Sequence, residues 1–199
     1  MAETNEKLKK VTRIANLLTP MCKYVLTESA NKITYDALQI HGGTGYMKEF
    51  KVERLTRDAR ITNIYEGTSQ LQIVAAAGNV INDILAEEFD EKAAKEYKGA
   101  LNNLAQHLIE IRDIFKDSLA YVLDKKDNAF QDVAAKDLVE LYSYLYVGYL
   151  LLEEAEIEPR KVFIANRYII NSLSNARKNA ESIKNELFSD ILHADKILI

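Results

Sequence analysis

The stretch ALQIHGGTGYMKEFKVERLTRDARITNIYEGTSQLQ, residues 37–72, decides the fold prediction because its glycines and its charged run divide the chain into helices. Three of the seven glycines fall within HGGTG, residues 41–45, so the backbone turns there along a path that side chains would obstruct. The charged run that follows predicts a short helix over 51–60. A connection over 61–67 then leads to a further helix over 68–88.

Upstream of this stretch, residues 5–18 carry apolar side chains at helical spacing. Thr19 followed by Pro20 is typical of an N-cap and a first helical residue, which predicts a second helix over 20–40. One continuous helix kinked at Pro20 is the alternative interpretation. Either arrangement brings a helix C-terminus to HGGTG, where glycine is the commonest capping residue.

Downstream, the sequence contains only helical patterns. Apolar and aromatic residues step alternately by four and three from Tyr97 to Val122, a spacing typical of helices packed in a bundle. With only 7 glycines and 2 prolines in 199 residues, turns are few and helices are long. We predict an all-α chain, an up-and-down helical bundle in residues 1–88 followed by a second helical bundle in residues 89–199.

Short interruptions separate the later helices. Asp127-Asn128 precedes a helix over 129–157, and its part from 141 to 152 is apolar almost all round. Such a helix is central or lies at a subunit contact. Glu158-Pro159 begins another helix, and a short last helix is expected over 186–193.

The composition narrows the class of protein. A net charge of −4 offers no basic surplus to neutralise phosphates, so we expect no nucleic-acid partner. The longest apolar stretch is shorter than the roughly 20 residues that span a bilayer, so we expect no membrane partner. The one cysteine, Cys22, is expected to be buried. Because a single cysteine cannot form an internal disulfide and the N-terminus lacks an apolar leader, we expect a cytoplasmic protein. The three histidines lack metal-ligand spacing, so no metal site is expected.

Three motifs in residues 37–72 resemble the C-terminal signature of acyl-CoA dehydrogenases. They are QIHGG-GY, VER--RDARI and IYEGTSQ, in this fixed order. The resemblance extends over residues 8–88, and the remainder is more weakly similar to the helical extension of longer family members. We therefore identify the chain as the C-terminal helical part of such an enzyme.

This resemblance implies oxidation of an acyl-CoA thioester to the trans-2-enoyl-CoA, with FAD as the cofactor. Glu66 matches the carboxylate that removes the α-proton while the β-hydride goes to flavin N5. A free Glu, with a pKa of about 4.3, is a weak base, so the role requires a water-excluded site that raises its basicity. The backbone N–H of Glu66 and a flavin ribityl hydroxyl would donate to the thioester oxygen, and Gly67 would let the thioester lie close to the backbone.

The remaining matches concern cofactor and substrate contacts. Thr68 and Gln70 match positions that contact FAD, and Tyr65 matches a residue that lines the acyl pocket. The segment that reaches the FAD of a neighbouring subunit is matched by Gln39, Gly42 and Gly43. This last match implies a homo-oligomer.

Each assignment has a structural alternative that the residues alone leave open. Glu66 could balance the dipole of the following helix, Thr68 could be only its N-cap, and Tyr65 could be a core residue. HGG could be an ordinary helix C-cap. We interpret the Lys and Arg residues from 48 to 60 as a solvated, salt-bridged face without a site role.

The resemblance also implies parts that this sequence lacks. The family's chain begins with a helical domain and a small β-barrel domain, which hold most of the flavin and the acyl-CoA. We expect the fragment to be inactive alone, with the missing N-terminal domains, acyl-CoA and electron-transfer flavoprotein as its partners. The competing hypothesis is a helical self-association module, motivated by the apolar stretch 141–152. A DNA-associated flavoprotein is disfavoured by the acidic charge balance.

Overall fold

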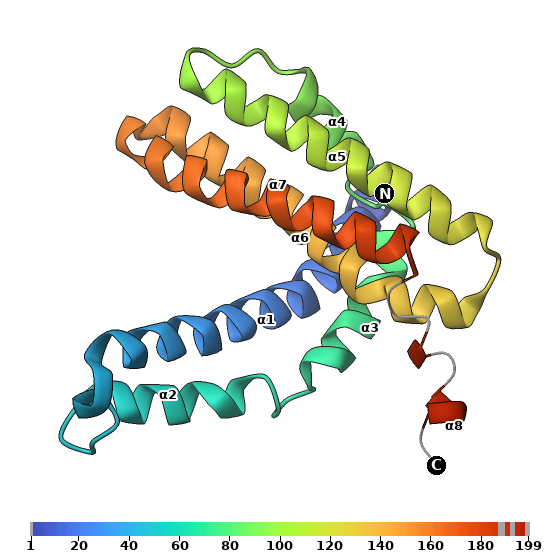
Figure 1. Cartoon of the computed structure of the whole chain (residues 1–199). Helices are drawn as coiled ribbons and strands as arrows, with labels where there is room; N and C mark the ends of the chain where they lie inside the picture. The colour runs from blue at the N-terminus through green and yellow to red at the C-terminus, as the bar shows by residue number, and fades with distance from the viewer. Residues whose placement is uncertain (1, 187–189, 192–193, 198–199) are drawn as a thin grey trace. The chain divides into compact units, whose positions relative to one another are not determined.

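A computed structural model describes residues 2–186, 190–191 and 194–197 (Figure 1). Every regular element in these residues is a helix, which confirms the predicted all-α class. The chain divides into two compact units, unit 1 (Met1–Ala76) and unit 2 (Ala77–Ile199). That division does not decide where the predicted domains 1–88 and 89–199 meet, which stays a prediction. None of the described helices combines the length and apolarity that a membrane crossing requires.

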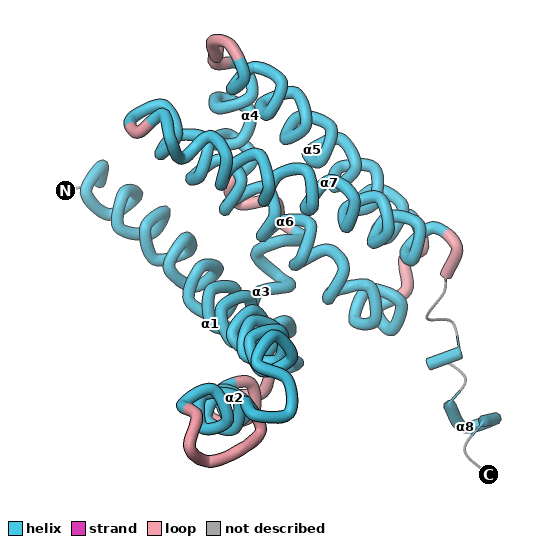
Figure 2. Tube along the Cα trace, turned by 60° about the vertical axis from the view of Figure 1, so that its left-hand side comes forward, coloured by secondary structure: helices cyan, strands magenta, loops and turns pink. Residues whose placement is uncertain are grey.

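Unit 1 is built on two helices, α1 (Ala2–Gly45) and α2 (Lys51–Thr62), which lie side by side in both views (Figures 1 and 2). Because α1 continues through Pro20, the predicted N-cap at Thr19 is wrong and the single-helix alternative is right. Leu17 and Met21, on either side of the proline, are buried, and their packing compensates for the hydrogen bond that proline cannot donate. Cys22, expected to be buried, is exposed.

The turn predicted at HGGTG is present. Gly42 leaves helical geometry with φ 63° and ψ −154°, a conformation that glycine adopts without a steric penalty. Gly45 is needed for a different reason, because an added Cβ would lie 2.4 Å from the Cβ of His41 and 3.3 Å from Val52 Cγ1. The chain therefore reverses tightly here and begins α2 at Lys51, as predicted.

Polar side chains join α1 to α2. The side-chain amide of Asn31 donates to the carbonyl oxygen of Ala59 at 3.0 Å, and the hydroxyl of Thr56 donates to the carbonyl oxygen of Thr34 at 3.2 Å. These hydrogen bonds fix the register of the two helices. They also fix the position of residues 63–68, the connection that follows α2.

The predicted helix over 68–88 is wrong in its second half. α3 (Ser69–Ile81) ends at a turn, and α4 (Ala86–Ala94) is a separate helix. Asp83 in this turn has φ 45°, a conformation that a right-handed helix excludes. Its carboxylate accepts two hydrogen bonds from Arg112, at 2.9 and 2.7 Å, and one from the Tyr142 hydroxyl at 3.1 Å. Contacts from distant residues thus override the local helical pattern.

Three long helices form the core of unit 2, namely α5 (Ala100–Asp124), α6 (Asn128–Ile157) and α7 (Val162–Lys184). Each contacts the other two. The 3₁₀ turn η1 (Pro159–Lys161) joins α6 to α7, and α8 (Ala194–Ile197) follows. The predicted last helix over 186–193 lies largely outside the described residues.

The start of α6 and the packing of α5 follow the predictions. The side chain of Asp127 caps α6 by accepting a hydrogen bond from the Ala129 N–H at 2.9 Å. The seam predicted along α5 is buried, with Leu108, Ile111 and Phe115 fully inaccessible to solvent.

The apolar stretch 141–152 makes α6 the central helix of unit 2. Tyr142 and Tyr149 are at most 1% exposed, and the Tyr142 ring meets the rings of Phe89 and Phe115 edge-on, at 5.1 Å each. Most of the stretch that motivated the self-association hypothesis is thus buried in the chain, although Leu150 is 43% exposed, and the hypothesis stays a prediction.

Candidate functional site

The connection between α2 and α3, residues 63–68, carries the predicted catalytic residue and its neighbours. Glu66 has φ 53° and Gly67 has φ 90°, so two successive residues adopt positive φ. For a glutamate this conformation costs about 1–3 kcal/mol, so surrounding contacts must hold it. Gly67 suits this position because φ 90° is a conformation that side chains disfavour, and an added Cβ would lie 2.6 Å from Gln72 Nε2 and displace that amide.

Side chains from the flanking helices hold the carbonyl groups of this connection. Lys23 Nζ, on α1, donates to the carbonyl oxygen of Tyr65 at 2.8 Å and also to that of Gly67. Gln72 Nε2, on α3, donates to the carbonyl oxygen of Glu66 at 3.1 Å. Three consecutive carbonyl oxygens therefore accept hydrogen bonds from α1 and α3.

Glu28 of α1 fastens the ends of the connection. Its Oε1 accepts hydrogen bonds from Asn63 Nδ2, at 3.1 Å, and from the Ser69 hydroxyl. The backbone N–H of Ser69 donates to the Asn63 carbonyl oxygen at 3.2 Å, and Arg60 donates to Asn63 Oδ1 at 2.6 Å. The connection is thus tied to α1 at its beginning, middle and end.

The backbone N–H groups of Glu66 and Gly67 form no hydrogen bond within the described part of the chain. Each peptide here is trans, so its C=O and N–H point in opposite directions. Because α1 and α3 hold the carbonyls of Tyr65 and Glu66, the N–H groups of Glu66 and Gly67 point away from those contacts. Successive N–H groups arranged in this way can receive a polarised or anionic oxygen.

The side chains of the connection are open to solvent. The Glu66 carboxylate is exposed and Tyr65 is 49% exposed, so this chain alone does not provide the water-excluded carboxylate that the base role requires. Thr68 Oγ1 accepts a hydrogen bond from the Leu71 N–H at 3.3 Å, so Thr68 does cap α3. Gln70 is exposed in the first turn of that helix.

The second group of predicted residues, Gln39, Gly42 and Gly43, lies at the opposite end of α2. All three are exposed, and a Cβ added to either glycine would meet no atom within 4 Å. The 12 residues of α2 separate this group from Glu66 by about 18 Å, at 1.5 Å per residue. The structure therefore does not bring the two groups together.

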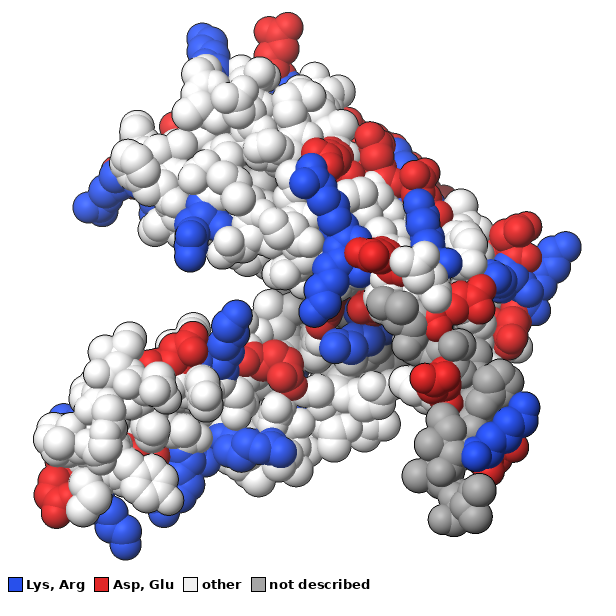
Figure 3. All heavy atoms as spheres, in the orientation of Figure 1, with Lys and Arg blue, Asp and Glu red and all other residues white. Residues whose placement is uncertain are grey.

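The charged residues from 48 to 60 form the solvated face that the sequence predicts. Arg54 pairs with Asp58 at 3.3 Å and Arg57 pairs with Glu53 at 3.4 Å, and the two arginine side chains are 77% and 69% exposed. On the face drawn in Figure 3, acidic and basic side chains are interspersed rather than gathered by sign.

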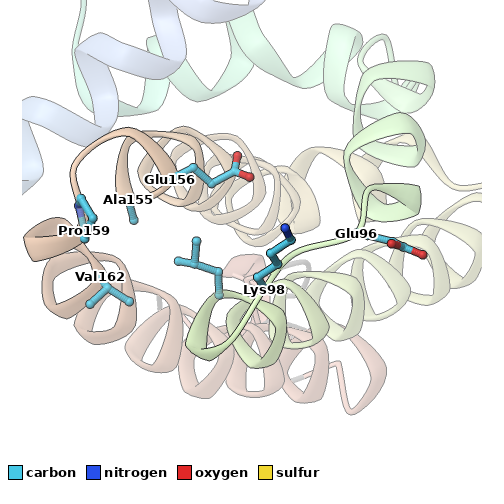
Figure 4. A pocket seen from close by; sticks show the side chains of 7 residues that line it. Glu96, Lys98, Ala155, Glu156, Pro159 and Val162 are labelled. Carbon is cyan, nitrogen blue, oxygen red and sulfur yellow. The ribbon is translucent and has the colours of Figure 1, made fainter.

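Two pockets lie outside the connection. In unit 1, a pocket between α1 and α2 is lined by Asn31, Tyr35, Leu38, Tyr46, Glu53, Thr56, Arg57 and Arg60. In unit 2, a pocket near the start of α5 is lined by Glu96, Lys98, Leu101, Ala155, Glu156, Pro159 and Val162 (Figure 4). Neither contains a residue of the predicted site, so we assign neither a role.

Sequence reasoning missed the residues that position the connection, namely Lys23, Glu28 and Gln72. A signal for the first of them exists in α1, where polar residues recur at helical spacing on the side that meets α2. That stripe consists of Lys23, Thr27, Asn31 and Thr34. A polar stripe along an otherwise ordinary helix indicates a neighbouring segment with exposed carbonyl groups, but it does not identify that segment.

Comparisons with known proteins match both parts of the chain. The family model described as "Acyl-CoA dehydrogenase, C-terminal domain" matches residues 2–81, and the model described as "Acyl-CoA dehydrogenase C terminal" matches residues 78–190. A crystal structure of an acyl-CoA dehydrogenase complexed with FAD from Bacillus anthracis superposes with a TM-score of 0.69 at 20% identity. That match covers 82% of this chain and 32% of the other, and it supports the fold.

Curated relatives match about a third of the chain. The caffeyl-CoA reductase–Etf complex subunit CarC of Acetobacterium woodii is 51% identical over 61 residues, which are 31% of this chain and 16% of the relative. The mitochondrial short-chain specific acyl-CoA dehydrogenase of Bos taurus is 52% identical over 61 residues, which are 31% of this chain and 15% of the relative. The matched part of the chain spans about a sixth of the length of these relatives.

Proposed function

The chain belongs to the acyl-CoA dehydrogenase family, and on this premise we propose that it forms the general-base side of an FAD-dependent acyl-CoA dehydrogenase site. Glu66 removes the α-proton of an acyl-CoA thioester as the trans-2-enoyl-CoA forms. Bound FAD would supply the acceptor, flavin N5, for the β-hydride that leaves the substrate. The observation that carries the proposal is the connection 63–68, whose carbonyls are held by α1 and α3 while the Glu66 carboxylate and N–H remain free.

The reaction needs a stronger base and a more acidic α-carbon than water provides. Excluding water from a carboxylate raises its basicity, because the charged form loses solvation. Hydrogen bonds to the thioester oxygen stabilise the negative charge that develops as the α-proton leaves. Glu66 carries both groups, a carboxylate to take the proton and a backbone N–H to hold the oxygen.

The cover that excludes water comes from other parts of the full-length protein. The exposed Glu66 and the half-exposed Tyr65 form an open surface in this chain. The missing N-terminal domains complete the pocket, hold most of the flavin and receive the acyl chain. The fragment alone is therefore inactive.

The residues present fit FAD in two places. The N-terminus of α3 presents Thr68 and Gln70 to solvent, and a helix N-terminus favours polar or anionic ligand oxygens. Gly42 and Gly43 offer bare backbone with open space around it. From the family resemblance we propose that these places contact the flavins of two different subunits and that the protein is a homo-oligomer, and their separation by α2 is compatible with this.

The electron partner is an electron-transfer flavoprotein. A relative whose name places it in a reductase–Etf complex supports this assignment. The same relative favours a second candidate function, the reduction of an enoyl-CoA, in which protonated Glu66 gives its proton to the α-carbon. Assays with acyl-CoA and an electron acceptor, and with enoyl-CoA and reduced flavin, separate the two directions.

The test is the substitution Glu66→Gln in the flavin-loaded full-length protein. We expect FAD to be retained and the acyl-CoA-dependent bleaching of the flavin to be lost, because an amide cannot take the proton. Glu91→Gln is the matched control, since Glu91 is an exposed glutamate of α4. Unchanged bleaching in Glu66→Gln would place the base on another residue.

A further inference from the structure

We infer that Lys23 is a positioning residue of this site, which sets the direction of the Glu66 N–H and strengthens it as a donor to the thioester oxygen. The inference rests on the proposed function, because it needs a thioester oxygen at that N–H. The inference assigns a role to Lys23 on α1, which lies more than forty positions before Glu66 in the sequence and outside the three motifs.

The direction of the Glu66 N–H follows from the hydrogen bond to Tyr65. The carbonyl of Tyr65 and the N–H of Glu66 belong to one planar trans peptide, in which the two groups point in opposite directions. Lys23 Nζ donates to that carbonyl at 2.8 Å. The ammonium therefore fixes the N–H on the opposite side, where it has no partner within the described residues.

Lys23 also holds the backbone on the other side of Glu66. Its Nζ donates to the Gly67 carbonyl, so one ammonium bridges the carbonyls that precede and follow the Glu66 carbonyl. Glu66 stands between these anchors with φ 53°, a conformation that a glutamate leaves readily when nothing holds it. Without Lys23, relaxation of this residue would rotate the Glu66 N–H away from its present direction.

The charge of Lys23 acts on the same peptide. A hydrogen bond from an ammonium is roughly twice as strong as one between neutral groups. Such a bond draws electrons toward the Tyr65 carbonyl oxygen, so the N–H at the other end of the peptide becomes a stronger donor. Lys23 thus orients and polarises a single donor of the oxyanion-binding pair.

Gln72 provides an internal comparison. Its Nε2 donates to the Glu66 carbonyl at 3.1 Å, which belongs to the peptide that carries the Gly67 N–H. The contact is made by a neutral amide and lies one peptide further along the chain. We therefore expect Gln72→Met to affect the thioester oxygen less than Lys23→Met.

The experiment uses the flavin-loaded full-length protein and 4-(dimethylamino)cinnamoyl-CoA, a thioester whose absorption moves to longer wavelength when its carbonyl is polarised. Lys23→Met removes the ammonium while keeping a side chain of similar length, and Lys23→Arg restores a charged donor. Lys32→Met is the matched control, because Lys32 is an exposed lysine on the same helix.

We expect the bound probe to lose most of its red shift in Lys23→Met, to regain part of it in Lys23→Arg and to keep all of it in Lys32→Met. With acyl-CoA, kcat should fall about 10- to 100-fold in Lys23→Met, less than the 100- to 1,000-fold that deletion of a donor costs. KM should change little, because the interaction strengthens in the transition state.

A full red shift in folded Lys23→Met would overturn the inference. If Lys23→Met fails to bind flavin or to fold, Lys23→Gln takes its place and must lose part of the shift, and a full shift there overturns the inference equally. The probe reports polarisation without proton removal, so this result is independent of Glu66→Gln. Absence of a red shift in the unsubstituted protein would instead reject the proposed function.

Discussion

Replacing Asp83 by Asn removes the main counter-charge of a buried arginine. The Arg112 side chain is 3% exposed, and its two terminal nitrogens donate to both carboxylate oxygens of Asp83, which is 20% exposed. Although burial by itself lowers the pKa of Arg112, the hydrogen bonds and charge of Asp83 raise it above its ordinary value. Even without Asp83, Arg112 stays charged in the variant, because a guanidinium is not deprotonated in proteins. Asn suits the test because it tolerates the positive φ of this position.

The expected loss is about 2–4 kcal/mol of unfolding free energy, because breaking a buried pair typically costs 3–5 kcal/mol and a second carboxylate remains. That carboxylate belongs to Asp90, whose Oδ1 lies 3.5 Å from Arg112 Nε. In urea, with a slope of about 2–3 kcal/mol per molar, the midpoint of unfolding followed by helical circular dichroism should fall by about 1 M.

The control is Asp117→Asn, which alters a carboxylate that is 73% exposed and 4.0 Å from Lys184. We expect a change within about 0.5 kcal/mol there. Equal midpoints for Asp83→Asn and Asp117→Asn would refute the reasoning, since the buried charge would then be satisfied without Asp83.

Tyr142→Phe examines the same network from α6. The Tyr142 hydroxyl accepts a hydrogen bond from the Leu85 N–H at 2.8 Å and donates to Asp83 at 3.1 Å. Burial raises the pKa of Tyr142 far above its ordinary value, so the hydroxyl remains a donor at any pH the fold tolerates. Leaving the Leu85 N–H unsatisfied should cost about 1–3 kcal/mol. The double variant with Asp83→Asn should lose less than the sum, because the two residues share a hydrogen bond.

Three further outcomes are expected. Gly45→Ala should destabilise unit 1 by about 1–3 kcal/mol through overpacking, whereas Gly78→Ala, with open space around its Cβ position in α3, should stabilise by about 0.5–1 kcal/mol; equal melting temperatures would contradict both. Burial raises the pKa of Asp137 against a hydrogen bond from Ser182, so its ionisation opposes folding above the unfolded pKa of about 3.9. Asp137→Asn should therefore raise the urea midpoint at pH 7 and leave it unchanged at pH 3, and a lower midpoint at pH 7 would reverse the argument. The purified chain should bind FAD weakly and show no turnover, so stoichiometric FAD after gel filtration would contradict the proposal that other domains hold most of the flavin.

The boundaries that the sequence predicts well are those set by local chemistry. HGGTG turns the chain because Gly42 reaches a positive φ and Gly45 accepts close packing. Asp127 begins α6 because its short carboxylate reaches the first free N–H groups of the helix. Each signal lies within four residues of the boundary that it sets, so no knowledge of tertiary structure is required.

The helix boundaries that the sequence predicts wrongly are set by tertiary packing and by contacts with residues far along the chain. Pro20 resembles a helix start, but burial of Leu17 and Met21 keeps α1 continuous through it. The helix expected over 68–88 is broken at Asp83 by Arg112 and Tyr142, which lie far along the chain. Local helix propensity cannot reveal either effect, because the residues around Pro20 and Asp83 have the same composition whether the helix continues or breaks.

The candidate site shows the same division. The motif IYEGTSQ points to Glu66, and the left-handed backbone of Glu66 beside Gly67 agrees with a special role but does not test it. Lys23 and Glu28 escaped prediction because they bind backbone carbonyls and side chains of a connection over thirty positions away. Every residue has a backbone carbonyl oxygen, so the sequence of the connection does not show which carbonyl groups a distant side chain binds.

The exposure of Glu66 is compatible with its proposed role as a base, because the carboxylate would have different surroundings in the free chain and in the substrate-bound full-length protein. A carboxylate kept dry in the free chain would favour its protonated form and would have no lone pair ready for the α-proton. The base role requires that water be removed from the carboxylate only when substrate is bound, because exclusion of water raises the basicity of a carboxylate. Holding the backbone by its carbonyls suits such a site, since Lys23 and Gln72 fix the direction of the N–H groups without covering them. Under the proposed function, this chain therefore sets the direction of the N–H groups, and other domains would exclude water from the carboxylate.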